Sequence, residues 1–468
     1  MSADVPVARE PAPRRGRALA VPARVAHLLL DTGYAGLAVG LFPWALGRVF
    51  LNAKARARWT AYLRDVGARF GRRAPRTSGA PCVWVHGVSV GEVKAAARLV
   101  EQVEARVPGA EVVVTTTTDT GHRVACERYP GRRVEFYPPD VSWVVRATLD
   151  RLRPDLVVLV ESEFWPNFLV ATRDRGIPVA LVNGRISERS ASRFRRGGRL
   201  SRALLAAIEC FCVQLPVHAE RFRSLGVAAD RVVVTGNLKF DNVPVLVDRG
   251  RSDAWARRLG VGDGRPLFVA GSTHPPEERH VAAVVRSLRA RGVPLRAVVA
   301  PRHPARADAA EADLRRAGLE VVRRSRLGPE GAGAVPDAVV LLDSVGELES
   351  VYALADVVFV GGSLVRHGGQ NVMEPASVAK PILVGPHTWN FRGEVDLLAA
   401  AGALEVVDGP AALADALARC LADPSAAAAR GERGRAAILE SKGATERTLA
   451  VLEPWLAPLA ARAAARVS

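Results

Sequence analysis

The sequence predicts an α/β protein made of two doubly wound, Rossmann-like domains of parallel strands. The chain has 468 residues, too many for one hydrophobic core and enough for two such domains. Short apolar runs typical of buried parallel strands alternate with helical patterns along most of its length. Loops rich in glycine or charged residues follow several of these runs, at the strand ends where such sheets bind ligands.

The composition is that of a globular protein with a strong basic excess. Hydrophobic residues make up 49% and charged residues 24% of the chain, and the formal net charge is +17. This charge indicates a membrane surface, an acidic substrate or nucleic acid, although the Arg- and Ala-rich composition alone explains part of it. Since no basic patch is interleaved with aromatic residues, we expect no nucleic-acid partner. The five scattered cysteines have neither zinc nor disulfide spacing, which favours a reducing compartment.

The N-terminal region predicts attachment to a membrane. Residues 1–23 form a disordered basic tail, and residues 24–60 form a membrane-anchoring or interfacial segment with flanking arginines. Its uncharged part, Thr32 to Gly47, is shorter than the roughly 20 residues that a spanning helix needs. A hydrophobic helix docked on the first domain is the alternative.

The remaining chain divides into an acceptor-side domain (61–241), a linker (242–253), a nucleotide-sugar domain (254–440) and a C-terminal helix (441–468). Strands of the first domain are expected at 82–86, 111–115, 133–136, 156–160, 179–182, 210–213 and 232–234. Those of the second are expected at 267–270, 295–299, 320–322, 338–342, 357–360, 381–384 and 404–407.

Candidate catalytic side chains follow the strands of the first domain. Glu92 stands at the first turn of a helix, where the helix dipole favours a carboxylate that could act as a general base. Glu161 and Glu163 follow an apolar strand, and a structural pairing of Glu161 with Arg185 is an equal alternative. Lys239 follows another strand and could stabilise negative charge in a transition state. A capping glutamate and a surface lysine are the plain alternatives.

Other polar loops have two readings each. The hydroxyl-rich Thr115 to Gly121 binds ligand groups or caps a helix. In the second domain, Phe359 to Pro375 contains two glycine pairs, which allow a backbone to approach a phosphate. Arg302 suits a phosphate and Gly346 a close backbone approach, whereas ordinary connecting turns are the alternative. There is no Walker loop, dinucleotide fingerprint or metal-ligand spacing, so we expect no metal or other cofactor.

Taken in order, the motifs resemble those of the 3-deoxy-D-manno-octulosonic acid (Kdo) transferases of lipopolysaccharide assembly. They are WVHGVSVGE, TTTTDTG, ESEFWPN, NGRISERS, TGNLKFD, GST, PRHP, VGEL and GGSLVRHGGQNVMEPA. The resemblance implies a GT-B fold whose two domains face a crevice. It also implies inverting transfer of Kdo from CMP-Kdo to an anionic lipid A precursor such as lipid IVA. The site of action would be the cytoplasmic face of the inner membrane, with the N-terminal segment held by anionic lipids.

The resemblance also implies residue roles. Glu92 matches the general base, and Glu161 and Lys239 match residues that stabilise the transition state. The matches to the CMP-binding segments are Pro301, Arg302, Val345, Gly346, Glu347, Asn371, Val372, Met373 and Glu374.

The chain departs from the family pattern at three places. Gly184 replaces the usual Ala, Gln370 replaces the usual His, and Leu215-Pro216 replaces a hydroxyl–acid pair. These departures leave open a related GT-B glycosyltransferase with another nucleotide sugar or lipid acceptor. The number of Kdo units transferred and the oligomeric state are also left open.

Overall fold

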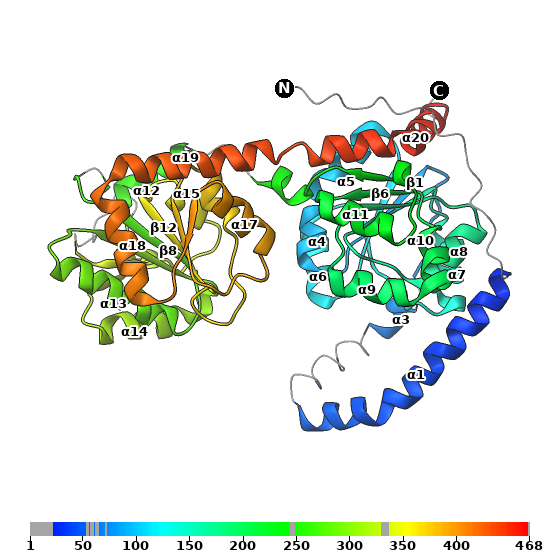
Figure 1. Cartoon of the computed structure of the whole chain (residues 1–468), viewed down its shortest axis with the longest axis horizontal. Coiled ribbons are helices and arrows are strands. Elements are labelled where there is room, and N and C mark those ends of the chain that lie inside the picture. Colours follow the sequence, from blue (N-terminus) through cyan, green and yellow to red (C-terminus); the bar gives the residue numbers. More distant parts are fainter. Residues whose placement is uncertain are drawn as a thin grey trace. The chain divides into compact units, whose positions relative to one another are not determined.

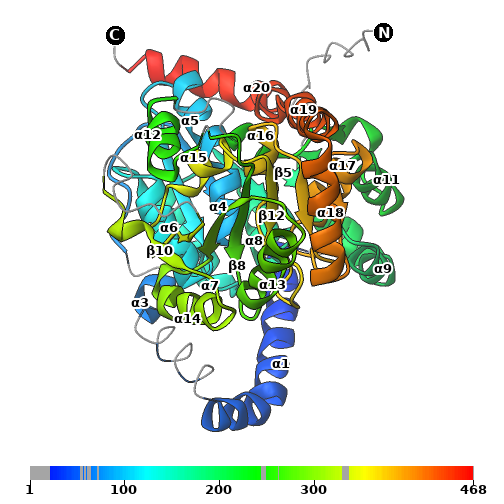
Figure 2. The same cartoon turned by 90° about the vertical axis from the view of Figure 1, so that its left-hand side faces the viewer.

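The computed structural model divides the chain into two compact units, each built around its own sheet (Figures 1 and 2). Unit 1 contains the chain up to Asn242 together with Lys442–Ser468, and unit 2 contains Val243–Ser441. The structure describes residues 22–52, 56, 60, 65–70, 73–243, 249–261, 263–328 and 337–466. Most of the predicted basic tail and part of the predicted anchor, including Lys54 and Arg58, lie outside these residues.

Unit 1 has a seven-stranded parallel sheet in the order β3-β2-β1-β4-β5-β6-β7. Its strands are β1 (Cys82–His86), β2 (Glu111–Thr116), β3 (Arg133–Phe136), β4 (Leu156–Val160), β5 (Val179–Gly184), β6 (Cys210–Val213) and β7 (Val232–Val234). All seven expected strands are confirmed. β1 and β4 are buried along their whole length, as expected of central strands covered on both faces.

Helices cover both faces of this sheet. They are α3 (Val66–Arg69), α4 (Val90–Ala95), α5 (Ala97–Arg106), α6 (Asp119–Arg128), α7 (Ser142–Leu152), α8 (Pro166–Asp174), α9 (Glu188–Arg196), α10 (Gly198–Leu205), α11 (Pro216–Ser224) and α20 (Ala444–Ala464). Residues of α7, α8 and α11 share one core cluster, whereas residues of α4, α5 and α20 share the other. Asp241 fixes the start of α20 by accepting the backbone N–H groups of Gly443 and Thr445 at 2.7 and 2.5 Å.

The N-terminal helix α1 (Ala23–Leu51) docks on unit 1 through its first turns. Ala23, Ala26 and Leu30 pack against the core cluster that contains α7 and α8. The His27 Nδ1 lies 2.6 Å from the Asn167 Oδ1, and the Tyr34 hydroxyl donates to Asp140 at 2.8 Å. Among the described residues, no helix is both long enough and apolar enough to cross a membrane.

Unit 2 repeats the plan of unit 1 with a second seven-stranded parallel sheet, in the order β10-β11-β9-β8-β12-β13-β14. Its strands are β8 (Leu267–Thr273), β9 (Arg296–Pro301), β10 (Val321–Arg323), β11 (Val339–Leu341), β12 (Val357–Val360), β13 (Ile382–Val384) and β14 (Leu404–Val406). The expected strands of this domain are confirmed as well.

The helices of unit 2 are α12 (Arg249–Leu259), α13 (Glu277–Ala290), α14 (Ala307–Arg316), α15 (Leu348–Tyr352), α16 (Met373–Ser377), α17 (Arg392–Ala400), α18 (Pro410–Ala422) and α19 (Pro424–Glu440). Helix α12 begins inside the segment 242–253 that the sequence favours as a linker. Its start is explained by Trp255, which is 2% exposed and draws the helix onto the unit.

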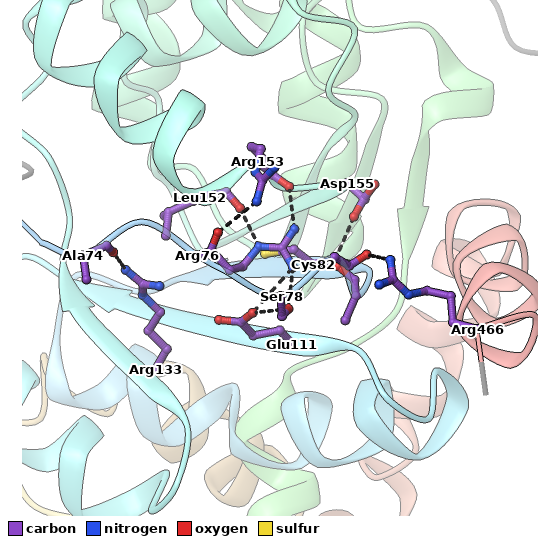
Figure 3. A network of polar contacts seen from close by, with 12 residues as sticks. Ala74, Arg76, Ser78, Cys82, Glu111, Arg133, Leu152, Arg153, Asp155 and Arg466 are labelled. Atoms are coloured by element: carbon purple, nitrogen blue, oxygen red, sulfur yellow. Dashed lines mark hydrogen bonds and ion pairs between the residues drawn. The ribbon is translucent and has the colours of Figure 1, made fainter.

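A buried arginine joins the amino ends of the unit 1 strands, at the edge opposite to the loops that carry the candidate site (Figure 3). The Arg76 guanidinium donates to the carbonyls of Ala80 and Leu152 at 2.6 and 2.8 Å. It also lies 3.5 Å from Glu111 at the start of β2. Nearby, Asp155 accepts the backbone N–H of Cys82 at 2.8 Å. This network is structural, because its polar groups form hydrogen bonds and ion pairs with one another.

We expect Arg76→Ala to lower the local free energy of unfolding by about 2–4 kcal/mol, because buried carbonyls lose a charged donor. Hydrogen exchange at the amides of β1 measures this directly. Arg123→Ala, on the exposed face of α6, is the matched control and should change it by less than about 0.5 kcal/mol. Equal protection of β1 in both variants would contradict the structural role of Arg76.

Candidate active site

The carboxyl ends of β1 and β4 form the switch point of the unit 1 sheet. The two strands are neighbours, but the chain leaves β1 for α4 on one face and β4 for α8 on the other. Loops that diverge in this way leave a crevice at the sheet edge, where open α/β sheets bind ligands. Glu92 follows β1, whereas Glu161 and Glu163 follow β4, so this edge collects the predicted carboxylates.

Glu92 is held in one orientation at the start of α4. One carboxylate oxygen accepts the backbone N–H of Val88 and the other accepts the Ser89 hydroxyl, both at 2.7 Å. Ser89 also caps the helix by accepting the backbone N–H of Glu92. The side chain therefore has the capping role offered as the plain alternative. Each oxygen keeps a second lone pair, so capping leaves the carboxylate able to accept a proton.

Burial raises the pKa of Glu92 above that of an ordinary glutamate. The Ser89 hydrogen bond opposes this rise, whereas the nearby carboxylate of Glu161 adds to it. The result is a more basic carboxylate, which favours general-base chemistry near neutral pH.

Threonines of the TTTTDTG motif hold the loop that positions Glu92. The Thr116 hydroxyl donates to the carbonyl of Val88 at 2.8 Å, and Thr118 caps α6 by accepting the backbone N–H of Gly121 at 3.0 Å. Of the two readings of this motif, helix capping is therefore present, and Thr116 adds a contact that the sequence did not predict.

Glu161 pairs with Arg185, as the structural alternative predicted. The Arg185 Nε lies 2.6 Å from one Glu161 oxygen, and the Glu161 side chain is buried whereas that of Arg185 is more than half exposed. Glu161 has a backbone φ of 68°, a left-handed conformation that costs a non-glycine residue about 1–3 kcal/mol. This left-handed conformation turns the chain sharply at the end of β4.

Glu163 is the carboxyl group most altered by this environment. Burial and the charge of Glu92 raise its pKa to about 7, although the Trp165 indole donates to it at 2.8 Å. Glu163 therefore retains a proton into the neutral range.

Lys239 lies in a short 3-10 helix, η2 (Leu238–Asn242), that packs beside α4. The backbone N–H of Leu238 donates to the Asn183 side chain at 3.0 Å, and the Asn242 amide donates to the carbonyl of Ala95 at 2.9 Å. These bonds attach the Lys239 segment both to the end of β5 and to the helix that carries Glu92. The structure thus gathers the three predicted catalytic residues on one unit.

In unit 2, the switch point lies between β8 and β12, which are neighbours in the sheet. The glycine-rich loop after β12 wraps around the buried carboxylate of Glu277, at the start of α13. The backbone N–H groups of Gly362, Ser363 and Leu364 donate to Glu277 at 2.6, 3.0 and 2.9 Å. The Glu277 carboxylate therefore occupies the N–H groups beside the first glycine pair, which the sequence offered to a ligand phosphate.

The residues predicted for CMP follow β9, β11 and β12 but differ in what they can offer. Arg302 is exposed, whereas Val372 and Met373 are buried and present only their backbone. Glu347 forms an ion pair with Arg324 at 2.9 Å. Asn371 donates to the Glu374 carboxylate at 2.9 Å and accepts the backbone N–H of Met373 at 3.1 Å.

The other predicted CMP residues lie in the same loops. Pro301 ends β9 and is buried, Val345 is 84% exposed, and Gly346 has a φ of 82° that favours glycine. Sequence reasoning missed Glu277 entirely, because a glutamate after two prolines resembles an ordinary helix start.

Comparisons with known proteins define the class and then the family. The fold is similar to that of a glycosyltransferase from Rickettsia africae, with a TM-score of 0.53, 10% identity and coverage of 81% of this chain and 99% of that one. The chain has the GT-B fold, as expected from its motifs.

The family follows from the sequence comparisons. Residues 64–242 match the family model of the 3-deoxy-D-manno-octulosonic-acid transferases (kdotransferases). The 3-deoxy-D-manno-octulosonic acid transferase of Bordetella pertussis is 38% identical over 90% of this chain and 97% of its own length. That of Haemophilus influenzae is 32% identical over 80% of this chain and 87% of its own length. This chain belongs to the 3-deoxy-D-manno-octulosonic acid transferase family.

The raised pKa of Glu163 predicts a pH-dependent stability. The pKa of Glu163 is about 7 in the folded protein and about 4.5 in the unfolded chain. Between these pH values the folded protein keeps a proton on this carboxyl group that the unfolded chain has lost. Its contribution to stability is complete below about pH 4.5 and is lost as the pH rises through about 7.

The free energy of unfolding of the parent protein should therefore fall between pH 5 and pH 8. We expect this fall to be smaller by about 2–3 kcal/mol in Glu163→Gln, which has no carboxyl group to titrate. Urea unfolding at both pH values measures this difference. Glu127→Gln, on exposed α6, is the control and should follow the parent protein. Parallel pH dependence in all three proteins would contradict the buried titration.

Proposed function

We propose that this chain transfers Kdo from CMP-Kdo to a lipid A precursor resembling lipid IVA, with inversion at the anomeric carbon. The observation that carries the proposal is Glu92, a buried carboxylate fixed by the Val88 N–H and the Ser89 hydroxyl at the switch point of unit 1. Membership of the Kdo transferase family supports the sugar, and the motifs that resemble CMP-binding segments support the donor.

The proposed reaction is a single displacement. Glu92 removes the proton from an acceptor hydroxyl, and the oxygen forms a bond to the anomeric carbon of Kdo from the side opposite to CMP. The bond between the anomeric carbon and the phosphate oxygen of CMP breaks, and its electron pair leaves with CMP. Because CMP departs carrying its own charge, the step needs positive groups and N–H donors more than a protonating acid.

Glu161 and Lys239 are proposed to stabilise the transition state. Glu161 forms an ion pair with Arg185 at the turn that ends β4. Its proposed role is to hold this pair of charges near Glu92. Lys239 supplies a cation from the segment attached to α4. The donor is proposed to lie on the loops of unit 2 that contain Arg302, Gly346 and Asn371. The proposal needs no metal.

We expect Glu92→Gln to lower kcat about 10²–10⁴-fold while the protein stays folded, because glutamine keeps the capping contacts but accepts no proton. The assay is transfer from CMP-Kdo to a tetraacylated lipid A precursor, with products weighed by mass spectrometry. Glu220→Gln, on the exposed surface of α11, is the matched control.

Full activity of Glu92→Gln, or no transfer by the parent protein, would contradict the proposal. Competition between nucleotides tests the donor separately. Because Gln370 and Leu215-Pro216 depart from the family pattern, tighter binding of UDP than of CMP would favour a related glycosyltransferase with another donor.

We also propose that α1 lies on the surface of the inner membrane, on its cytoplasmic face. The face of α1 that docks on unit 1 contains Ala23, Ala26 and Leu30 together with the polar His27 and Tyr34. Three other leucines of α1 point elsewhere: Leu28, Leu29 and Leu37 are 67%, 65% and 59% exposed. An exposed apolar helix on a protein of net charge +17 suits an interfacial position on anionic lipids.

We expect replacement of Leu28, Leu29 and Leu37 by serine to weaken binding to vesicles of anionic phospholipid by at least about tenfold, because three leucines leave the acyl region. Co-sedimentation at low and high salt measures it. The control is Leu200→Ser with Leu439→Ser, which removes exposed leucines outside α1. Equal binding of both variants and the parent would contradict the role of α1.

A further inference from the structure

Three histidines gather at the carboxyl ends of neighbouring strands in unit 2. His274 follows β8, His303 follows β9, and His367 lies in the loop after β12. The ring centroids of His274 and His367 are 3.7 Å apart, and those of His274 and His303 are 6.1 Å apart. Gly362 permits this packing, because a Cβ there would lie 3.2 Å from the His274 ring.

The histidine cluster stands in a basic environment at the switch point of the sheet. Arg302 and Arg306 follow β9, and their charges act on His274. The Gln370 amide nitrogen lies 3.0 Å from the His274 Nε2. Burial, followed by the charges of His367 and Arg306, lowers the pKa of His274 to about 4. Its ring is therefore neutral at pH 7 and accepts from the Gln370 amide.

The acidic groups beside the cluster are already engaged. Glu277 accepts the backbone N–H of His274 at 2.8 Å in addition to the three donors of the loop after β12. Glu278 is fully buried, pairs with Arg306 at 3.0 Å and accepts the Thr273 hydroxyl at 3.0 Å. Glu278 thus balances the charge of Arg306, and its second oxygen has no hydrogen-bond partner. Glu277 is held by neutral backbone amides and does not pair with Arg302 or the imidazoles.

The glycine-rich loop after β12 is already occupied by the Glu277 carboxylate, so an anionic ligand would need the histidine cluster instead. Glu277 holds the N–H groups of Gly362, Ser363 and Leu364, so this part of the loop has no donors left for a phosphate. An anionic ligand at the same switch point must be bound by other groups. The described residues show no arrangement of three histidine, cysteine or acidic side chains that would hold a metal ion.

We propose that His274, His303 and His367, with Arg302, form the subsite that binds an oxyanion of the donor, either the nucleotide phosphate or the sugar carboxylate. The inference rests on the proposed function for the identity of the donor. An oxyanion beside His274 offsets the burial and the nearby positive charge that keep its ring neutral, so binding draws a proton onto His274. Ligand binding is then accompanied by proton uptake.

Titration calorimetry with CMP and with cytidine tests this subsite. Measurements at pH 7 in two buffers of different ionisation enthalpy give the number of protons taken up. We expect uptake of up to about one proton with CMP and none with cytidine. His367→Phe, which keeps a ring against His274, and His303→Ala should each weaken CMP binding about tenfold and reduce the uptake.

His280→Phe is the matched control, because His280 lies on α13 and burial alone lowers its pKa. Unchanged CMP affinity in both cluster variants but a raised KM for CMP-Kdo would assign the subsite to the sugar carboxylate. Unchanged CMP affinity, unchanged KM and no proton uptake would overturn the inference and leave the proposed function intact. Failure of the parent protein to bind CMP would overturn the donor assignment and this subsite together.

Discussion

The position of the first strand in each sheet is the constraint on which the site depends. β1 and β8 each lie inside their sheet, away from its edges, with later strands added on both sides. Each sheet therefore has a switch point at the carboxyl ends of two central strands, β1 and β4 in unit 1 and β8 and β12 in unit 2. Because these central strands are buried on both faces, their polar residues are confined to the carboxyl ends. The same topology leaves the amino ends to structural contacts such as those of Arg76.

The two switch points gather different ionisable side chains, in keeping with the different chemistry that each would support. Unit 1 gathers Glu92, Glu161 and Glu163, and their mutual repulsion raises the pKa of Glu92 and of Glu163 beyond the effect of burial. Unit 2 gathers histidines and Arg302 around His274. A base needs a carboxylate reluctant to stay ionised, whereas an anionic leaving group needs cations that have no other partner. Each arrangement is unfavourable without its substrate, which is the usual mark of a functional site.

Much of the fold and only part of the site can be predicted from the sequence. Strands such as Leu156–Val160 are continuous apolar runs bounded by polar loops, so local pattern suffices. Glu161 could be found because it follows such a run directly, and Glu92 because it stands at the start of the helix after the first run. The role of Glu277 could not, since it depends on a loop 85 residues further along the chain. The packing of α20 on unit 1 likewise depends on Asp241, which is 202 residues from Gly443.

The segment after β4 connects the proposed chemistry to the proposed membrane helix. Within a few residues it contains Glu161 and Glu163 at the switch point, the Trp165 that donates to Glu163, and the fully buried Asn167. Asn167 contacts His27 at 2.6 Å and donates to Asp31 at 2.8 Å, both on α1. The helix that exposes its leucines is therefore attached to the same short stretch that places two carboxyl groups. With the proposed lipid acceptor, this attachment would set the orientation of the carboxylates relative to the proposed membrane surface. A flexible tether would supply affinity for the membrane without that orientation.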